Sequence, residues 1–350
     1  MKKLLLSIVA LCLLFTSCDK ETEVTKKRTA MSISLVAEAG TRASTDVTQE
    51  EENKVTSMTV LIFSATSDVL ERKAEIHGIT GKITDLTVGN KKIVVIANPS
   101  SALKTQLASV TSYADLNDGT KVNLELSSQF QGPADGSMNQ TVGLTMTGEA
   151  TASLSAGDEN KVGVTVKRVV AKVKLGTVTI TPDVGYDKTK FQLLGVSVQK
   201  ARSKSMLGFT SHLLPEVSPS LFNYLCGTII SASPNVDYRL TGSAVEGQNT
   251  EYFYVMPNNN DTGNCTLLVI KGKYDGNQQY FVFRINDVYD NVNPLTGRFI
   301  EANHQYTLNV TLKRLGDGST DPNVPSDPTS LDVTVTPENW VVVPTQDVTW

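Results

Sequence analysis

Short runs in which apolar and polar residues alternate make up most of this chain, and such alternation predicts β-strands with one buried face. A clear example is the run over residues 31–39, where Met31, Ile33, Leu35 and Ala37 fall on one face. The same period recurs in further predicted strands, at 55–63, 141–148, 191–198, 252–256, 265–270, 280–285 and 306–312. Strong helical periodicity is rare, and Thr, Ser and Val are abundant. The pattern therefore predicts an all-β protein built from β-sandwiches.

Residues 91–97 (KKIVVIA) break this pattern, because their apolar run is continuous. Such a run predicts a strand that is buried on both faces. An Asn-Pro pair ends it, and Ser101 can then cap a short helix. The apolar residues of that helix recur at helical spacing: Leu103, Leu107 and Val110.

The phase of the alternation changes shortly after residue 160. The apolar residues fall first on even and then on odd positions: Val162, Val164 and Val166, then Val169, Ala171, Val173 and Leu175. A slip of one residue turns every side chain to the other face, so Lys167 and Arg168 mark a bulge or a passage between sheets. We therefore predict an N-terminal domain over 43–160 and a C-terminal domain over 161–315.

Residues 316–350 are predicted to be a linker, rich in Gly, Pro, Asp and Ser, followed by an apolar tail. The apolar residues of the tail include Leu331, Val333, Val335, Trp340, Val342 and Trp350. An alternating apolar segment beyond a flexible linker needs a surface to pack against. It can fold back as the last strand of its own domain, or it can pack on another molecule.

The first 18 residues predict export. Lys2 and Lys3 precede an apolar stretch, residues 4–15, that is too short to span a bilayer as a stable helix. Two small residues then precede Cys18, as a lipoprotein signal peptidase requires, and a diacylglycerol on Cys18 would tether the chain to a membrane. The alternative is an ordinary secretory signal with an incidental cysteine.

Composition and charge narrow the classes of partner. The formal net charge is −4, and loss of the leader makes it more negative, so a nucleic-acid partner has no electrostatic support. A hydrophobic content of 40% and a charged content of 19% are typical of a globular protein. Outside the leader and Cys18, the cysteines are Cys226 and Cys265. In an oxidising compartment they could form a disulfide, or they could be two separate buried thiols.

The sequence offers no catalytic or metal-binding constellation. His77, His212 and His304 lack zinc-ligand spacing, and no hydrolase, phosphate-binding or dinucleotide motif is present. Residues 258–264 and 317–321 lack the spaced oxygen ligands of a calcium loop. We therefore predict no cofactor, no metal and no enzymatic activity.

One binding function stays open as an alternative. Tyr224, Tyr252, Tyr254 and Tyr280 could form an aromatic platform on a monomeric, glycan-binding surface lipoprotein. Their alternating placement makes most of them core residues instead, and an exposed aromatic cluster would decide between the two.

The order of several motifs resembles the fimbrillin family, the subunits of type V pili. After the leader, the motifs are Thr41-Arg42-Ala43, VTSMTVLIFS at Val55, KKIVVIANPSS at Lys91, LTMTGE at Leu144, VKRVVAKVKL at Val166, NHQYTLNVTLKRLGDG at Asn303 and LDVTVTPENW at Leu331. The resemblance runs across nearly the whole chain, although 210–250 matches no motif of the family.

This resemblance implies two β-sandwich domains of transthyretin-like or immunoglobulin-like topology and assembly by strand exchange. An outer-membrane lipoprotein precursor would be cut between Arg42 and Ala43, which makes 19–42 a propeptide comprising a tether and a removable first strand. The C-terminal strand of another subunit, drawn from 331–350, would then fill the vacated position.

The implied partners are other pilin subunits, namely further copies, an anchor and a tip protein, together with the outer membrane before processing and an unidentified surface receptor. The implied location is the outer membrane surface and then the extracellular fimbrium. An uncut anchor subunit and a tip subunit are the alternatives within the same class.

Overall fold

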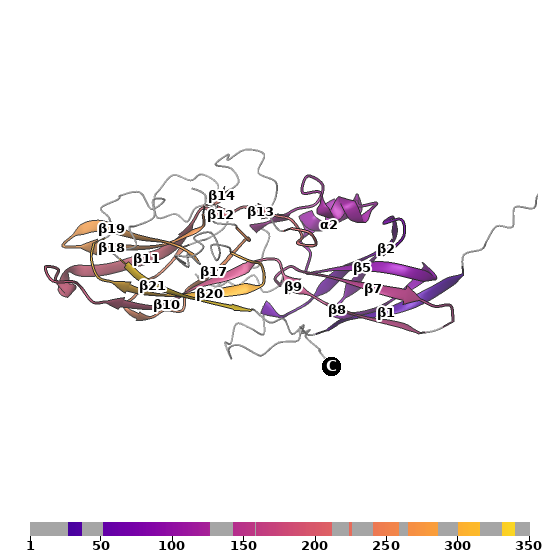
Figure 1. The fold of residues 1–350 in the computed structure, drawn as a ribbon, viewed down its shortest axis with the longest axis horizontal. Helices are drawn as coiled ribbons and strands as arrows, with labels where there is room; N and C mark the ends of the chain where they lie inside the picture. Colours follow the sequence, from indigo (N-terminus) through magenta and orange to yellow (C-terminus); the bar gives the residue numbers. More distant parts are fainter. Residues whose placement is uncertain are drawn as a thin grey trace, which may run out of the picture.

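The computed structural model describes residues 27–36, 52–126, 143–157, 159–211, 224–225, 241–258, 265–285, 300–315 and 331–339. For 224–225, 241 and 331–339 it describes the backbone alone. The molecule is elongated, and its N-terminal and C-terminal halves follow one another along the long axis (Figure 1).

The N-terminal half is a sandwich of two sheets. The five-stranded sheet has the order β3 (Leu70–His77), β2 (Ser57–Ser64), β5 (Gly89–Ala97), β7 (Met146–Leu154) and β9 (Lys167–Arg168). The three-stranded sheet has the order β4 (Thr80–Thr87), β1 (Arg28–Val36) and β8 (Asn160–Thr165). Neighbouring strands are antiparallel except β1 and β8, which are parallel. One hydrophobic core lies between these two sheets.

Strand β5 is buried on both faces, as the sequence predicts. Ile93 and Val95 face the three-stranded sheet. Val94 and Ile96 face the other way, into a second hydrophobic core that also contains residues of the C-terminal half. Helix α2 (Ser101–Ala108) contributes Leu103 and Leu107 to that second core. The predicted cap was wrong by one residue: the Ser100 hydroxyl accepts from the backbone N–H of Leu103 at 3.2 Å, and Ser101 is the first helical residue. A 3₁₀ helix, η1 (Tyr113–Asn117), and the short strand β6 (Leu124–Glu125) follow.

The C-terminal half is a second sandwich. Its first sheet has the order β16 (Gly247–Gln248), β10 (Ala171–Ile180), β20 (His304–Leu312) and β21 (Leu331–Asn339), with β17 (Tyr252–Val255) also paired to β10. Its second sheet has the order β15 (Thr241–Gly242), β11 (Phe191–Gln199), β18 (Leu267–Tyr274) and β19 (Asn277–Arg284). A short 3₁₀ helix, η3 (Lys188–Lys190), precedes β11. Two small pairs complete the half: β12 (Ala201–Arg202) with β14 (Tyr224–Leu225), and β13 (Lys204–Ser205) with β6.

The predicted change of phase near Lys167 and Arg168 is a passage between sheets. The even-numbered valines before it lie in the core between the N-terminal sheets, and the odd-numbered apolar residues after it lie in the second core. The predicted domain boundary at 160/161 falls too early, because β8 pairs with β1 and β9 pairs with β7. The strands of the N-terminal sandwich therefore extend to Arg168, and those of the C-terminal sandwich begin at Ala171.

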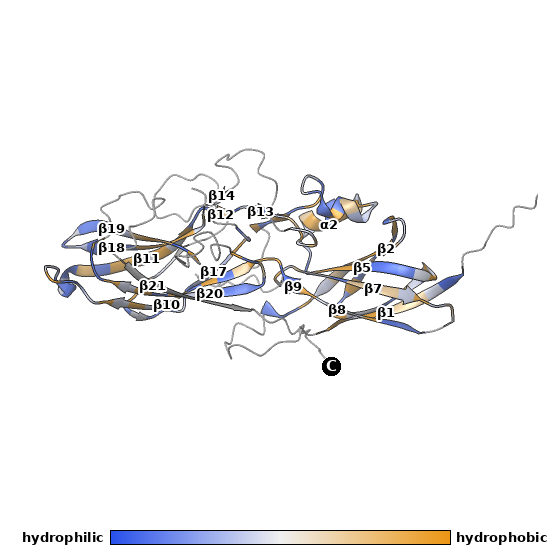
Figure 2. Cartoon of the chain, in the orientation of Figure 1, coloured by the Kyte–Doolittle hydropathy of each residue, from blue (hydrophilic) through white to orange (hydrophobic). Residues whose placement is uncertain are grey.

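The all-β class with one short helix is confirmed, but some strands differ from the prediction. The predicted strand at 141–148 is β7, which runs from Met146 to Leu154. The sequence did not predict β3 and β4, whose sequences (LERKAEIH and TGKITDLT) are rich in polar residues. Both are edge strands that bury few side chains: none of β3, and Ile83 and Leu86 of β4. A weak apolar pattern therefore suffices for them. Figure 2 shows that hydrophobic and hydrophilic stretches are mixed along the strands of both halves.

Candidate functional site

The first strand, β1, lies at the centre of its sheet although it is the first described element of the chain. It pairs antiparallel with β4 on one side and parallel with β8 on the other. Met31 is fully buried, Ile33 is 2% exposed and Leu35 is 7% exposed. These three side chains belong to the core between the two N-terminal sheets. The predicted alternation of this strand is thus confirmed over 31–36, and Ala37 lies outside the described residues.

Polar side chains fix the beginning of β1. The Thr29 hydroxyl donates to the carbonyl of Ser155 at 2.9 Å. The side-chain amide of Asn160, the first residue of β8, donates to the Thr29 hydroxyl at 3.0 Å and to the Ala30 carbonyl at 2.9 Å. The Arg28 guanidinium lies 3.5 Å from the Asp85 carboxylate, in an exposed pair worth little. Thr29 and Asn160 therefore define where β1 sits along its neighbours.

Loss of β1 would leave a slot bounded by two strand edges. The edges of β4 and β8 would both present unpaired backbone groups, and the side chains beneath β1 would lose their cover. Such a surface favours the entry of another extended segment, which supplies backbone hydrogen bonds along its length and side chains at alternate positions. The central position of β1 thus makes the N-terminal sandwich dependent on one strand.

The chain after β1 is fixed at the junction between the two halves. The Glu52 carboxylate accepts from the Lys172 ammonium at 2.8 Å, and both side chains are 2% exposed. The Tyr254 hydroxyl donates to the same carboxylate at 2.6 Å. Burial, followed by the charge of Glu52, raises the pKa of the Tyr254 hydroxyl well above its ordinary value. Glu52, the first described residue after β1, is therefore firmly anchored.

Further contacts at the junction involve the buried Arg168. Its guanidinium donates to the Asn53 side chain and to the Glu52 carbonyl. Its backbone N–H donates to the side chain of Asn303, at the start of the chain into β20. A hollow of about 260 Å³ lies beside this contact and is lined by Thr147, Glu149, Lys167, Phe209 and Asn303 among others.

This buried charged cluster was not predicted from the sequence. Its one signal is that Arg168 and Lys172 stand within an otherwise apolar run, whereas nothing local marks Glu52.

The tail occupies the edge of its own sheet. Strand β21 pairs antiparallel with β20 over its whole length, so that Leu331, Val333 and Val335 lie opposite Leu312, Val310 and Leu308. This is the folded-back arrangement that the sequence left open. Trp340, Val342 and Trp350 lie outside the described residues, as do Cys18, Arg42 and Ala43.

The tyrosine platform does not form as an exposed cluster. Tyr254 is 1% exposed and Tyr280 is 3% exposed. Tyr252 is half-buried with its ring against that of Tyr254. The side chain of Tyr224 lies outside the described residues.

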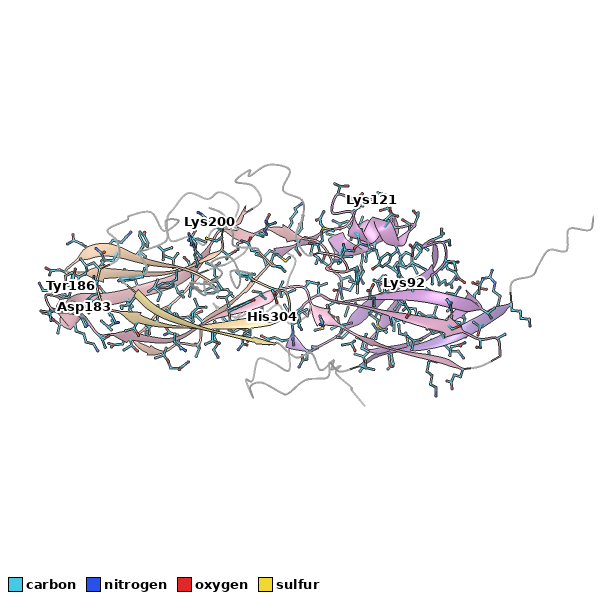
Figure 3. The ribbon with its side chains drawn as sticks, viewed as in Figure 1. Lys92, Lys121, Asp183, Tyr186, Lys200 and His304 are labelled. Atoms are coloured by element: carbon cyan, nitrogen blue, oxygen red, sulfur yellow. The ribbon has the colours of Figure 1, made fainter. Side chains whose placement is uncertain are left out.

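The remaining candidate residues are spread over the molecule. His304 lies near the middle of the molecule (Figure 3). His77 is exposed at the end of β3, and His212 lies outside the described residues. Cys265 is a buried free thiol, and because Cys226 lies outside the described residues, their pairing stays a prediction.

The described part of the chain lacks two further kinds of feature. No group of three or more His, Cys, Asp or Glu side chains there could hold a metal ion. No helix among those residues is both long and apolar enough to cross a membrane.

Comparison with known proteins identifies relatives of this chain. Residues 29–190 match the family model described as "Major fimbrial subunit protein (FimA)". The major fimbrium subunit FimC of Porphyromonas gingivalis is 25% identical over 236 residues, which cover 66% of this chain and 46% of that protein. Over these regions the chain is similar to fimbrial subunit proteins. The matched region spans about half the length of this curated relative.

Solved structures with the same fold cover nearly the whole chain. A protein of Parabacteroides distasonis with a proposed role in cell adhesion matches with a TM-score of 0.68 at 18% identity, over 90% of this chain and 99% of that one. The fimbrilin FimA of P. gingivalis matches with a TM-score of 0.59 at 18% identity, over 91% and 99%. The tip fimbrial protein Mfa3 of P. gingivalis matches with a TM-score of 0.52 at 14% identity, over 89% and 100%. The fimbrillin resemblance drawn from the sequence is confirmed.

Proposed function

We propose that this chain is a shaft subunit of a surface fimbria that supports adhesion. It is exported as a lipoprotein anchored through Cys18, cut after Arg42, and polymerised when the tail of one subunit replaces β1 of the next. The observation that carries the proposal is the position of β1: it is central in its sheet, and it is joined to the rest of the chain through the segment that contains Arg42.

The energetics of β1 are consistent with a removable and replaceable strand. Burial of three large apolar side chains contributes roughly 5–9 kcal/mol at about 1.5–3 kcal/mol each. Without a replacement, the processed subunit would expose this apolar surface and two strand edges. A donor strand restores both, while ordering of the donated segment opposes the gain. The joint needs no disulfide, and its separation is slow because it requires local unfolding.

Donation from one subunit to the next also explains the shape of the assembly. The donor and the acceptor are different surfaces, so the contact does not close on itself and generates a filament. In the precursor β1 already fills the slot, so cleavage after Arg42 acts as the switch. The same cut separates the lipid on Cys18 from the body.

The experiment that tests this proposal is Arg42→Ala in the full chain. We expect this variant to remain a surface-held monomer that keeps β1. In polymers of the unaltered chain, mass spectrometry should find Ala43 as the N-terminal residue. Polymers whose subunits begin before Met31 would contradict the processing step. Cys18→Ala should strand the precursor before the outer surface, and normal pili from that variant would contradict the lipoprotein route.

Deletion of 331–350 separates a shaft subunit from a tip or anchor subunit. The truncated subunit should still fold, because β21 is an edge strand, and it should accept a donor without giving one. In a mixture with the intact chain it should therefore shorten the filaments. Unchanged polymerisation of the truncated chain alone would refute strand donation.

A further inference from the structure

The tail and β1 share a threonine and the same alternation of apolar and polar residues when they are aligned at an offset of 300 residues. Residues 29–36 read TAMSISLV, and residues 329–336 read TSLDVTVT. We infer that, in the proposed polymer, residues 329–336 of a second copy occupy the slot in the direction of β1 and in this register, so that Leu331 replaces Met31. The inference rests on the proposed strand exchange and specifies its geometry.

The buried face fits this register. Leu331, Val333 and Val335 take the positions of Met31, Ile33 and Leu35, which point into the core. A register shifted by one residue would place Asp332 at a buried position, where an unpaired carboxylate is strongly disfavoured.

The exposed face provides charge complementarity. Ser32 is paired with Lys82 of β4 on one side and with Lys161 of β8 on the other. Both lysines are exposed, and Lys161 lies 3.3 Å from Glu159. Asp332 would take the position of Ser32 and bring a carboxylate between two ammonium groups. Opposite charges on directly paired positions of neighbouring strands stabilise the pairing.

The beginning of the strand provides a further match. Thr329 takes the position of Thr29, whose hydroxyl donates to Ser155 and accepts from Asn160. Ser330 takes the position of Ala30, where the pairing with β4 shifts by one residue and a small side chain is accommodated. The tail therefore has a threonine two residues before its first apolar residue, Leu331, as β1 has before Met31.

Registers shifted by two residues keep the alternation but lose specific contacts. If Val333 replaced Met31, Pro337 would fall at Leu35, whose N–H donates to the Ile79 carbonyl at 2.9 Å. Proline has no N–H to make that bond. If Leu331 replaced Ile33, Thr329 would fall at the fully buried position of Met31. Among the registers that run in the direction of β1 and keep the alternation, the offset of 300 avoids both of these losses.

A cysteine pair tests the register directly. Thr334 takes the position of Ser34, which is paired with Thr80 of β4. Thr334→Cys in one subunit and Thr80→Cys in another, mixed and assembled, should therefore form an intersubunit disulfide. The matched control is Asp332→Cys with Thr80→Cys, which should stay unlinked. A disulfide in the control pair would overturn the inference, because it reports a shifted or reversed donor.

A carbodiimide cross-link tests the charged contact in the unaltered chain. In polymers, mass spectrometry should find Asp332 joined by an amide bond to Lys82 or Lys161, and the uncut precursor should lack this link. Asp332→Lys should slow assembly by several-fold, and Lys82→Glu in the acceptor should restore the rate.

The outcomes separate this inference from the proposed function. Polymers that need 331–350 but link Asp332 only to other lysines would overturn the register and leave strand exchange intact. Polymers that form without 331–350 would refute strand exchange itself.

Discussion

The substitution Ile33→Ala tests the role of β1 most directly. Ile33 is 2% exposed and belongs to the core between the two N-terminal sheets. Truncation of a buried isoleucine to alanine costs about 2–5 kcal/mol, as lost burial and a residual cavity. The neighbouring residue Ser34 lies on the opposite face of the same strand and is half-buried. Ser34→Ala is thus the matched control, with an expected change of about 0.5 kcal/mol or less.

The assay compares the two variants before and after processing. In urea unfolding of the uncut precursor, Ile33→Ala should lower the free energy of unfolding by the stated amount. In the proposed polymer β1 has gone, so the finished filaments of both variants should have the same resistance to SDS. Since every 1.4 kcal/mol is a factor of ten, release of the weakened strand should become roughly 30-fold or more favourable, and assembly after cleavage should be faster.

Two results would refute this reasoning. Equal precursor stability for Ile33→Ala and Ser34→Ala would mean that β1 does not hold the N-terminal sandwich together. A filament weakened by Ile33→Ala as much as the precursor would mean that β1 remains in the assembled subunit.

Three further predictions concern the body of the protein. Lys172→Met should cost about 3–5 kcal/mol in urea unfolding because it removes the ammonium group that pairs with the buried Glu52 carboxylate, whereas Glu52→Leu combined with Lys172→Met should recover most of the loss. Asn98→Ala should cost about 2–4 kcal/mol, because Asn98 has a φ of 48° and its side chain bonds three backbone groups, and Asn98→Gly should lose less. A hydrogen bond from Lys121 and hydrogen bonds from two backbone N–H groups lower the pKa of Asp115 in the folded protein. The contribution of Asp115 to folding stability is therefore complete above its unfolded-state pKa of about 3.9, and it is lost as the pH falls through the lower folded-state pKa. Asp115→Asn should flatten the acid limb of the stability curve, and an unchanged limb would contradict this assignment.

The strands of the core could be predicted because burial on one face imposes a period of two. Met31, Ile33 and Leu35 are examples, and the continuous run in β5 likewise reports burial on both faces. The passage between the sandwiches also left a signal in the sequence, the one-residue slip, although a bulge would produce the same slip. Its assignment as a domain boundary at residue 160 failed, because β8 is short and alternation does not say which sheet a strand joins.

Edge strands and long-range polar contacts could not be predicted in the same way. β3 has little apolar surface to bury, and its side chains are mostly exposed. The hairpin between β18 and β19 does carry a local signal, the pair Asp275-Gly276, in which both residues have positive φ. This pair lies between the strands predicted at 265–270 and 280–285. Glu52 and Lys172 are 120 residues apart, so the sequence gives no reason to join them.

The location of β21 bears on how proposed assembly would be controlled. In the structure β21 is an edge strand with one paired neighbour, β20, whereas the slot filled by β1 has two. Moving the tail from its own edge into the slot of another subunit would thus exchange one ladder of backbone hydrogen bonds for two. While β1 is present this exchange is unavailable, and the tail covers the edge of its own sheet, which otherwise invites unspecific pairing. Removal of β1 changes only the acceptor, yet it reverses the preference of the tail. A single cut after Arg42 would therefore suffice to convert a stable monomer into a subunit that both needs and offers a strand.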